Sequence, residues 1–120
     1  MVKLVLDDLR RKQIEGVIIS DGLRLDEVMD FEDFENVLKH LKTEVEGNWQ
    51  VLDLRKRWAI SELAYALVEN LDKYVDAAGE KGEEIRNLIR EFADEVFSRV
   101  EMDDELLKFV QSQQSPDTSR

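Results

Sequence analysis

The segment Leu54–Val75, LRKRWAISELAYALVENLDKYV, is the densest apolar segment of the chain and decides its fold. After a basic triplet at 55–57, apolar side chains recur at three- and four-residue steps and so share one helical face. They are Ile60, Leu63, Ala64, Leu67, Leu71, Tyr74 and Val75. Ala59, Ala64 and Ala66 leave room for neighbouring helices to approach. The pattern predicts the central helix of a small helical domain.

Two residues compete to begin this helix. Asn48 as N-cap predicts a helix at about 49–76, whereas Asp53 as N-cap predicts a later start. We favour Asn48, because a cap at Asp53 places the basic triplet at the positive end of the helix dipole. The segment 77–82, AAGEKG, predicts a tight connection to the next helix.

A helix is predicted on each side of the central one. The first covers 31–46, with Asp30 as N-cap and Gly47 just after its last residue. Its apolar stripe is Phe34, Val37, Leu38, Leu41 and Val45. The second begins near Gly82 and breaks near Met102, because adjacent aspartates are poor in a helix interior. Its stripe is Ile85, Leu88, Ile89, Phe92, Val96 and Val100, and a further apolar turn holds Leu106, Leu107, Phe109 and Val110.

The remaining segments are less regular. Residues 2–15 predict a helix, with a short strand at 3–6 as the competing interpretation. The Asp-Gly pair at 21–22 favours a β-hairpin at 17–25, and an apolar loop beneath the helices is the alternative. Residues 111–120 are polar and predict a disordered tail. We therefore expect one domain at 1–110, all-α or mainly α, built as a bundle of about four helices.

Composition excludes several classes of function. The 120-residue chain has no cysteine, which removes disulfides, thiolate nucleophiles and Cys-based metal sites. It shows neither a signal-peptide pattern nor an apolar run of the ~20 residues that a membrane span needs. We expect a soluble, cytoplasmic protein. A net charge of −11 opposes direct binding to nucleic acid or anionic membranes and favours a basic protein partner.

Few residues offer catalytic chemistry. The single histidine, His40, lies beside the apolar face of its helix, and we interpret it as a solvent-facing structural residue. The spacing of Glu80 and Glu83, followed by Glu101 and Asp104, resembles the magnesium-binding pattern of all-α NTP pyrophosphatases. The resemblance implies a Mg²⁺-dependent phosphohydrolase that uses Glu83, Glu84, Glu101 and Asp104. The two pairs lie at opposite ends of one predicted helix, about 30 Å apart at ~1.5 Å per residue. A shared metal therefore requires a broken helix or a second subunit.

Two segments predict docking instead. The run at 26–35 interleaves carboxylates with aromatic rings, and we expect Phe31, Asp33 and Glu35 to bind a basic partner. Apolar residues beyond the bundle stripes, among them Phe109 and Val110, favour a homodimer. The leading hypothesis is a non-enzymatic interaction module (an adaptor, an inhibitor or an assembly subunit) that engages a basic or nucleic-acid-binding protein. It needs no metal or cofactor; the Mg²⁺-dependent hydrolase is the alternative.

Overall fold

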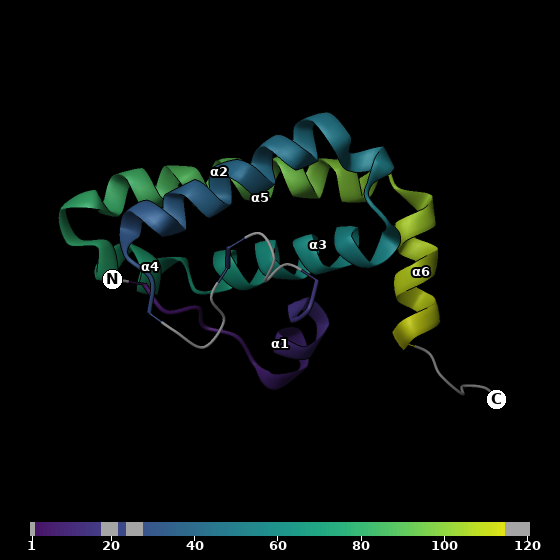
Figure 1. Ribbon diagram of the computed structural model, residues 1–120, viewed down its shortest axis with the longest axis horizontal. Coiled ribbons are helices and arrows are strands. Elements are labelled where there is room, and N and C mark those ends of the chain that lie inside the picture. Colours follow the sequence, from purple (N-terminus) through teal and green to yellow (C-terminus); the bar gives the residue numbers. More distant parts are fainter. Residues whose placement is uncertain (1, 18–21, 24–27, 115–120) are drawn as a thin grey trace.

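The computed structural model describes residues 2–17, 22–23 and 28–114 (Figure 1). Helices dominate these ranges, and the only β-type pairing in them is the bridge between Val2 and Met29. The helices are α1 (Asp8–Ile14), α2 (Phe31–Asn48), α3 (Leu54–Glu69), α4 (Leu71–Ala78), α5 (Gly82–Glu101) and α6 (Asp104–Gln114), with 3₁₀ turns η2 (Trp49–Val51) and η3 (Gly79–Lys81). The all-α prediction is confirmed, whereas the hairpin at 17–25 falls largely outside the described residues.

Helices α2 and α5 lie side by side and run in the same direction (Figure 1). Two ion pairs reflect this parallel direction. Glu35 near the start of α2 lies 4.0 Å from Lys81 just before α5, and Lys42 in the middle of α2 lies 3.4 Å from Glu91 in the middle of α5. α3 and α4 return antiparallel to this pair. α1 packs on α3, and α6 crosses the end where α2 and α5 finish. The first residues of α2 and α5 therefore meet at one end of the molecule.

The core lies between these helices and contains most residues of the predicted stripes, although Leu71 and Val75 of the central stripe are only half-buried. All five stripe residues of α2 are buried, and so are Ile85, Leu88, Ile89, Phe92 and Val96 of α5. Val100 is half-buried. The alanines of α3 are at most 1% exposed, which agrees with their expected role in close helix packing. Phe34 stacks on Tyr74 with ring centroids 5.8 Å apart and so joins α2 to α4.

The central segment is not one helix, which corrects the prediction for 49–76. Residues 49–51 form the separate turn η2, and α3 begins at Leu54 because the Asp53 carboxylate accepts the Lys56 amide (2.8 Å). α3 then ends at Glu69, and the side-chain amide of its C-cap, Asn70, donates to the Ala66 carbonyl (3.1 Å). α4 carries Tyr74 into the core as a separate helix.

The basic triplet does not prevent this later start because acidic partners compensate it. Arg57 is buried and pairs with Asp103 (3.1 Å), and it also donates to the carbonyls of Leu52 and Gln50 (2.9 Å each). Lys56 lies 3.9 Å from Glu44 of α2. Neighbouring negative groups therefore outweigh the unfavourable helix-dipole interaction that led us to reject Asp53.

The N-terminal helix is shorter than the predicted range 2–15. It begins at Asp8, because the Asp7 carboxylate accepts the Arg10 amide (2.8 Å). The preceding residues are not helical: Val2 exchanges backbone hydrogen bonds with Met29 at 2.7 Å, and the Val5 amide donates to the Tyr74 hydroxyl (2.9 Å). The competing strand at 3–6 is not formed either, since these residues pair with no second strand in the described ranges.

Two other boundaries differ from the sequence prediction. α2 continues through Gly47 to Asn48, so Gly47 is not the residue after the helix. The φ angle of Gly47 is not positive, as it would be in a glycine that ends a helix, and η2 follows α2 directly. The break near Met102 is confirmed, and α6 starts there because the Asp103 carboxylate accepts the Leu106 amide (3.0 Å). α6 reaches Gln114, so its last turn includes residues that we assigned to the polar tail.

Candidate docking surfaces

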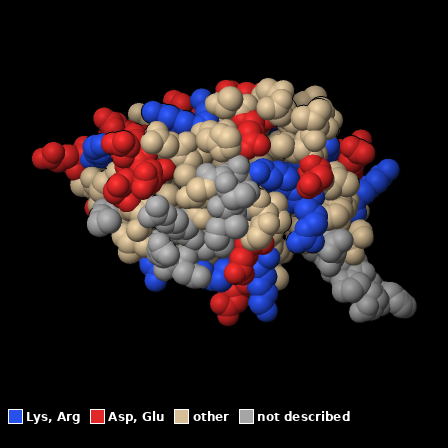
Figure 2. Space-filling view, in the orientation of Figure 1, with Lys and Arg blue, Asp and Glu red and all other residues tan. Residues whose placement is uncertain are grey.

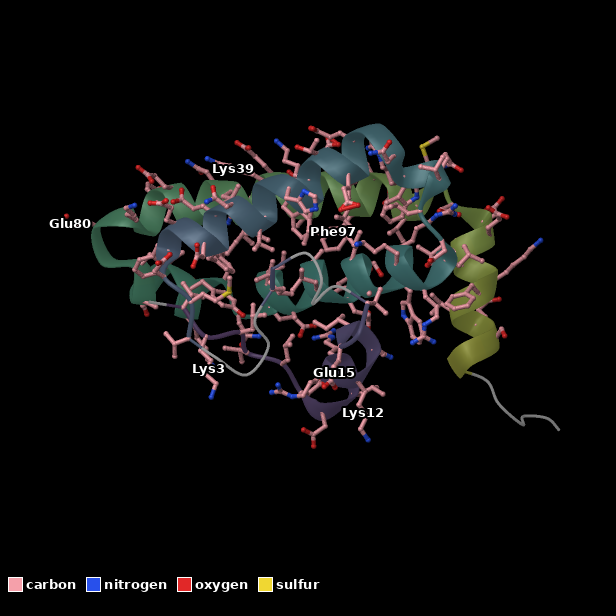
Figure 3. The ribbon with its side chains drawn as sticks, viewed as in Figure 1. Lys3, Lys12, Glu15, Lys39, Glu80 and Phe97 are labelled. Atoms are coloured by element: carbon pink, nitrogen blue, oxygen red, sulfur yellow. The ribbon has the colours of Figure 1, made fainter. Side chains whose placement is uncertain are left out.

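Two acidic segments that are distant in sequence come together where α2 and α5 begin. This acidic end consists of Glu32, Asp33 and Glu35 of α2, Glu80 of η3, and Glu83 and Glu84 of α5. Figure 2 shows carboxylates gathered at this end of the molecule, and Figure 3 places Glu80 at its tip. The parallel arrangement of α2 and α5 creates the cluster, because both helices carry acidic residues in their first turn.

Much of the charge at the acidic end is uncompensated. Glu35 pairs with Lys81, and Glu83 lies 3.7 Å from Arg86. Glu32, Asp33, Glu80 and Glu84 make no side-chain ion pair with any residue in the described ranges. Favourable interaction with the positive helix ends stabilises such residues. The negative field nevertheless extends into the solvent, where it can attract a cationic group.

The three residues predicted to dock through α2 do not all face the solvent equally. Phe31 is half-buried and packs against the core, so it offers only part of its ring as an anchor. Asp33 is half-buried, and its backbone amide is capped by Asp30 (2.8 Å). The Glu35 side chain is 18% exposed. The carboxylates of η3 and α5 extend this surface and were not grouped with it by sequence reasoning.

The carboxylates of the hydrolase hypothesis are separated by the length of α5. Glu83 and Glu84 lie in its first turn, and Glu101 is its last residue, about 27 Å away at ~1.5 Å per residue. Asp104 begins α6 near Glu101. Over residues 2–17, 22–23 and 28–114, no group of three or more histidine, aspartate or glutamate side chains is arranged to hold a metal ion. The structure therefore does not bring these four residues into one site.

A second candidate surface is an apolar groove between the α3–α4 segment and α5. The α3–α5 groove is lined by Val68, Leu71, Arg90, Ala93, Asp94 and Phe97 and encloses about 260 Å³. An adjoining hollow of about 510 Å³ shares Val68, Leu71 and Arg90, so the two are continuous. Tyr65 packs on the groove residue Phe97, with ring centroids 4.7 Å apart. Figure 3 shows Phe97 well away from Glu80, whereas the adjoining hollow extends to Arg86, which lies 3.7 Å from Glu83 of the acidic end.

No protein-family model matches the chain, and neither the curated proteins nor the solved structures compared with it give a significant match. Along the described ranges, no helix combines the length and apolar character needed to cross a membrane.

The residues predicted to form a C-terminal dimer contact are partly used inside the fold. Phe109 is half-buried and meets the Trp58 ring edge-on, with centroids 5.6 Å apart. Val110 is also half-buried against the core. Leu107, 42% exposed, is the more accessible apolar residue of α6. α6 packs on α3 through the contact between Phe109 and Trp58.

A hollow of about 500 Å³ lies at the opposite end of the molecule from the acidic end. It is bordered by Trp49, Val51, Arg99 and Met102, and the side chains of Val51 and Met102 are 80% and 87% exposed. Arg99 donates to Glu95 (3.1 Å) and to the Glu46 carbonyl (3.4 Å). Glu46, Asn48, Gln50 and Ser98 also line this hollow, so polar and apolar side chains are mixed there.

The ionisable side chains around Arg10 join α1 to α3. Arg10 donates to Glu69 (3.1 Å), which lowers the pKa of the Glu69 carboxyl. Burial raises the pKa of Glu62 above its ordinary value of 4.5, against the opposing effect of Arg10.

His40 is exposed and its Nε2 lies 3.1 Å from Glu44, which agrees with a structural role. Of these ionisable residues, only Glu69 lines the α3–α5 groove, and its carboxylate is already paired with Arg10.

Proposed function

We propose that the protein is a non-enzymatic interaction module that binds a basic protein partner through its acidic end. The observation that supports this proposal is the convergence of carboxylates from α2, η3 and α5 at one end of the fold. A partner with a lysine- or arginine-rich segment, such as a nucleic-acid-binding protein, has the complementary charge.

The uncompensated charge gives the proposed contact its direction. Four carboxylates of the acidic end have no ion-pair partner among the described residues: Glu32, Asp33, Glu80 and Glu84. Their negative charge is therefore not neutralised, and the negative electrostatic field is stronger there than around the paired carboxylates. Such a field accelerates encounter with a cationic partner and weakens as salt is added. The exposed part of Phe31 supplies an apolar contact next to the carboxylates.

A charge-matched comparison tests this proposal. Glu83→Gln together with Glu84→Gln removes two negative charges from the acidic end, and Glu101→Gln together with Asp104→Asn removes two from the opposite end. The tagged protein and both variants are used to capture partners from cells that express it, and bound proteins are quantified by mass spectrometry. We expect basic proteins with the unmodified protein and with the second variant, and at least about tenfold less of them with the first.

Equal loss with both variants would refute the proposal, because net charge rather than the acidic end would then determine capture. The same two variants examine the hydrolase alternative, since each removes half of its four carboxylates. Mg²⁺-dependent NTP turnover that either variant abolishes would replace the interaction hypothesis with an enzymatic one.

A further inference from the structure

We propose that the protein forms a two-fold symmetric dimer through the α3–α5 groove, in which Arg90 of each copy pairs with Asp94 of the other. This inference goes beyond the proposed function, because it concerns a different face and a different partner. It also differs from the C-terminal dimer contact that the sequence suggested.

The groove carries apolar surface that the fold leaves exposed. Tyr65 and Val68 are 44% and 40% exposed, although both belong to the helix with the most deeply buried core residues. Leu71 and Phe97 are half-buried beside them. Contiguous apolar surface with a polar rim is characteristic of protein interfaces. The groove therefore presents an apolar centre with charged residues at its edge.

The charges at this edge are arranged to match a second copy. Arg90 and Asp94 are both exposed, both line the groove, and neither forms an ion pair within the described ranges. They lie one turn apart on α5, a rise of about 6 Å. A two-fold axis that passes between them sets α5 of one copy antiparallel to α5 of the other. Arg90 then faces the second copy's Asp94, and the symmetry makes the same contact twice.

Charge complementarity favours a second copy over other partners at this face. With a net charge of −11, two copies repel one another over most of their surfaces. Here, however, the charges balance, because the groove is lined by three cations and three carboxylates: Lys73, Arg86 and Arg90, with Glu69, Asp72 and Asp94. A strongly basic protein would be drawn to the acidic end instead. A strongly acidic protein would be repelled by the molecule as a whole.

Charge reversal tests the dimer in a way that separates pairing from folding. We would measure self-association by sedimentation velocity up to about 100 µM, a range that detects dissociation constants near micromolar. Arg90→Asp alone and Asp94→Arg alone each place like charges together at both contacts. We expect each to weaken dimerisation about 100-fold. Circular dichroism verifies that the variants remain folded.

Two restorations complete the test. A mixture of the two single variants pairs opposite charges again, and so does the variant that carries both reversals. We expect dimers near the strength of the unmodified protein in both cases. A strictly monomeric unmodified protein, or a dimer that neither single reversal weakens, would overturn the proposal.

Failure of this proposal is distinguishable from failure of the proposed function. Glu32→Gln together with Glu80→Gln removes two charges of the acidic end at residues that line neither hollow of the groove, so this variant is expected to preserve the dimer while it reduces capture of basic proteins. Loss of the dimer with that variant would contradict the assignment of the two contacts to separate faces.

Discussion

Replacing Asp103 by alanine should destabilise the fold more than the loss of a helix cap can explain. Asp103 is 6% exposed, and one of its oxygens accepts both the Trp49 indole (2.8 Å) and Arg57 (3.1 Å). Its other oxygen accepts the Leu106 amide and so caps α6 (3.0 Å). A single carboxylate thus joins η2, α3 and α6.

The expected cost follows from what the substitution leaves behind. Removing one partner of a buried ion pair typically costs about 3–5 kcal/mol, because the other charge stays buried without compensation. Arg57 keeps its bonds to two backbone carbonyls and lies 3.5 Å from the exposed carboxylate of Glu105, which reduces that cost. Loss of the cap adds about 1 kcal/mol. We expect a total decrease of about 3–4 kcal/mol in the free energy of unfolding.

Urea unfolding followed by circular dichroism provides the measurement, with linear extrapolation to water. Asp53→Ala is the matched control, since Asp53 caps α3 through the same kind of bond but is exposed. It should cost only about 1 kcal/mol. Asp103→Asn, which retains the shape but not the charge, should fall between the two. If Asp103→Ala costs no more than Asp53→Ala, the buried ion pair contributes nothing and our reasoning is wrong.

Four other substitutions test the packing and the ionisable groups of the fold. Gly82→Ala should destabilise the protein by about 1–3 kcal/mol in urea unfolding, because the new Cβ would lie 3.0 Å from a Val75 methyl group and 3.1 Å from its carbonyl oxygen. Gly47→Ala, where nothing lies within 4 Å, should instead be stabilising by up to ~1 kcal/mol. Tyr74→Phe should cost about 1–3 kcal/mol by the same assay, since it leaves a backbone amide without its acceptor. Burial raises the pKa of the Glu62 carboxyl above its ordinary value of 4.5, so the folded state binds the carboxyl proton more tightly than the unfolded state does. Protonated Glu62 therefore contributes to the free energy of unfolding below pH 4.5, and this contribution is lost as pH rises through the pKa of the folded state. Relative to Glu62→Gln, the unmodified protein should therefore lose stability as pH rises through that window, and a difference independent of pH would contradict this assignment.

The helical stripes could be predicted because their information is local. Phe34, Leu38 and Leu41 recur with the helical period, and the structure buries all three. The start of α3 could not be predicted in the same way. Its basic triplet depends on the contact between Arg57 and Asp103, which are 46 positions apart in the chain. A prediction that weighs only helix caps and the helix dipole takes no account of Asp103, because this residue is distant in the sequence.

The candidate surfaces depended even more on tertiary arrangement. Sequence reasoning identified the acidic residues of α2 and those near Glu83 separately, but only the parallel packing of α2 and α5 brings them to one end. The groove was missed, although one signal for it existed. Tyr65 and Val68 are apolar residues of the central segment that lie outside its predicted buried stripe. Their exposure follows from that offset, whereas the position of Arg90 and Asp94 at the edge of the groove could be seen only in the folded structure.

The most direct test of the interaction hypothesis is an amide chemical-shift map of the labelled protein during titration with a lysine- and arginine-rich peptide. The hypothesis predicts shifts concentrated in the first turns of α2 and α5 and in η3, with an affinity that falls as salt is added. Shifts spread evenly over the acidic surface, or concentrated around Glu101 and Asp104, would contradict it.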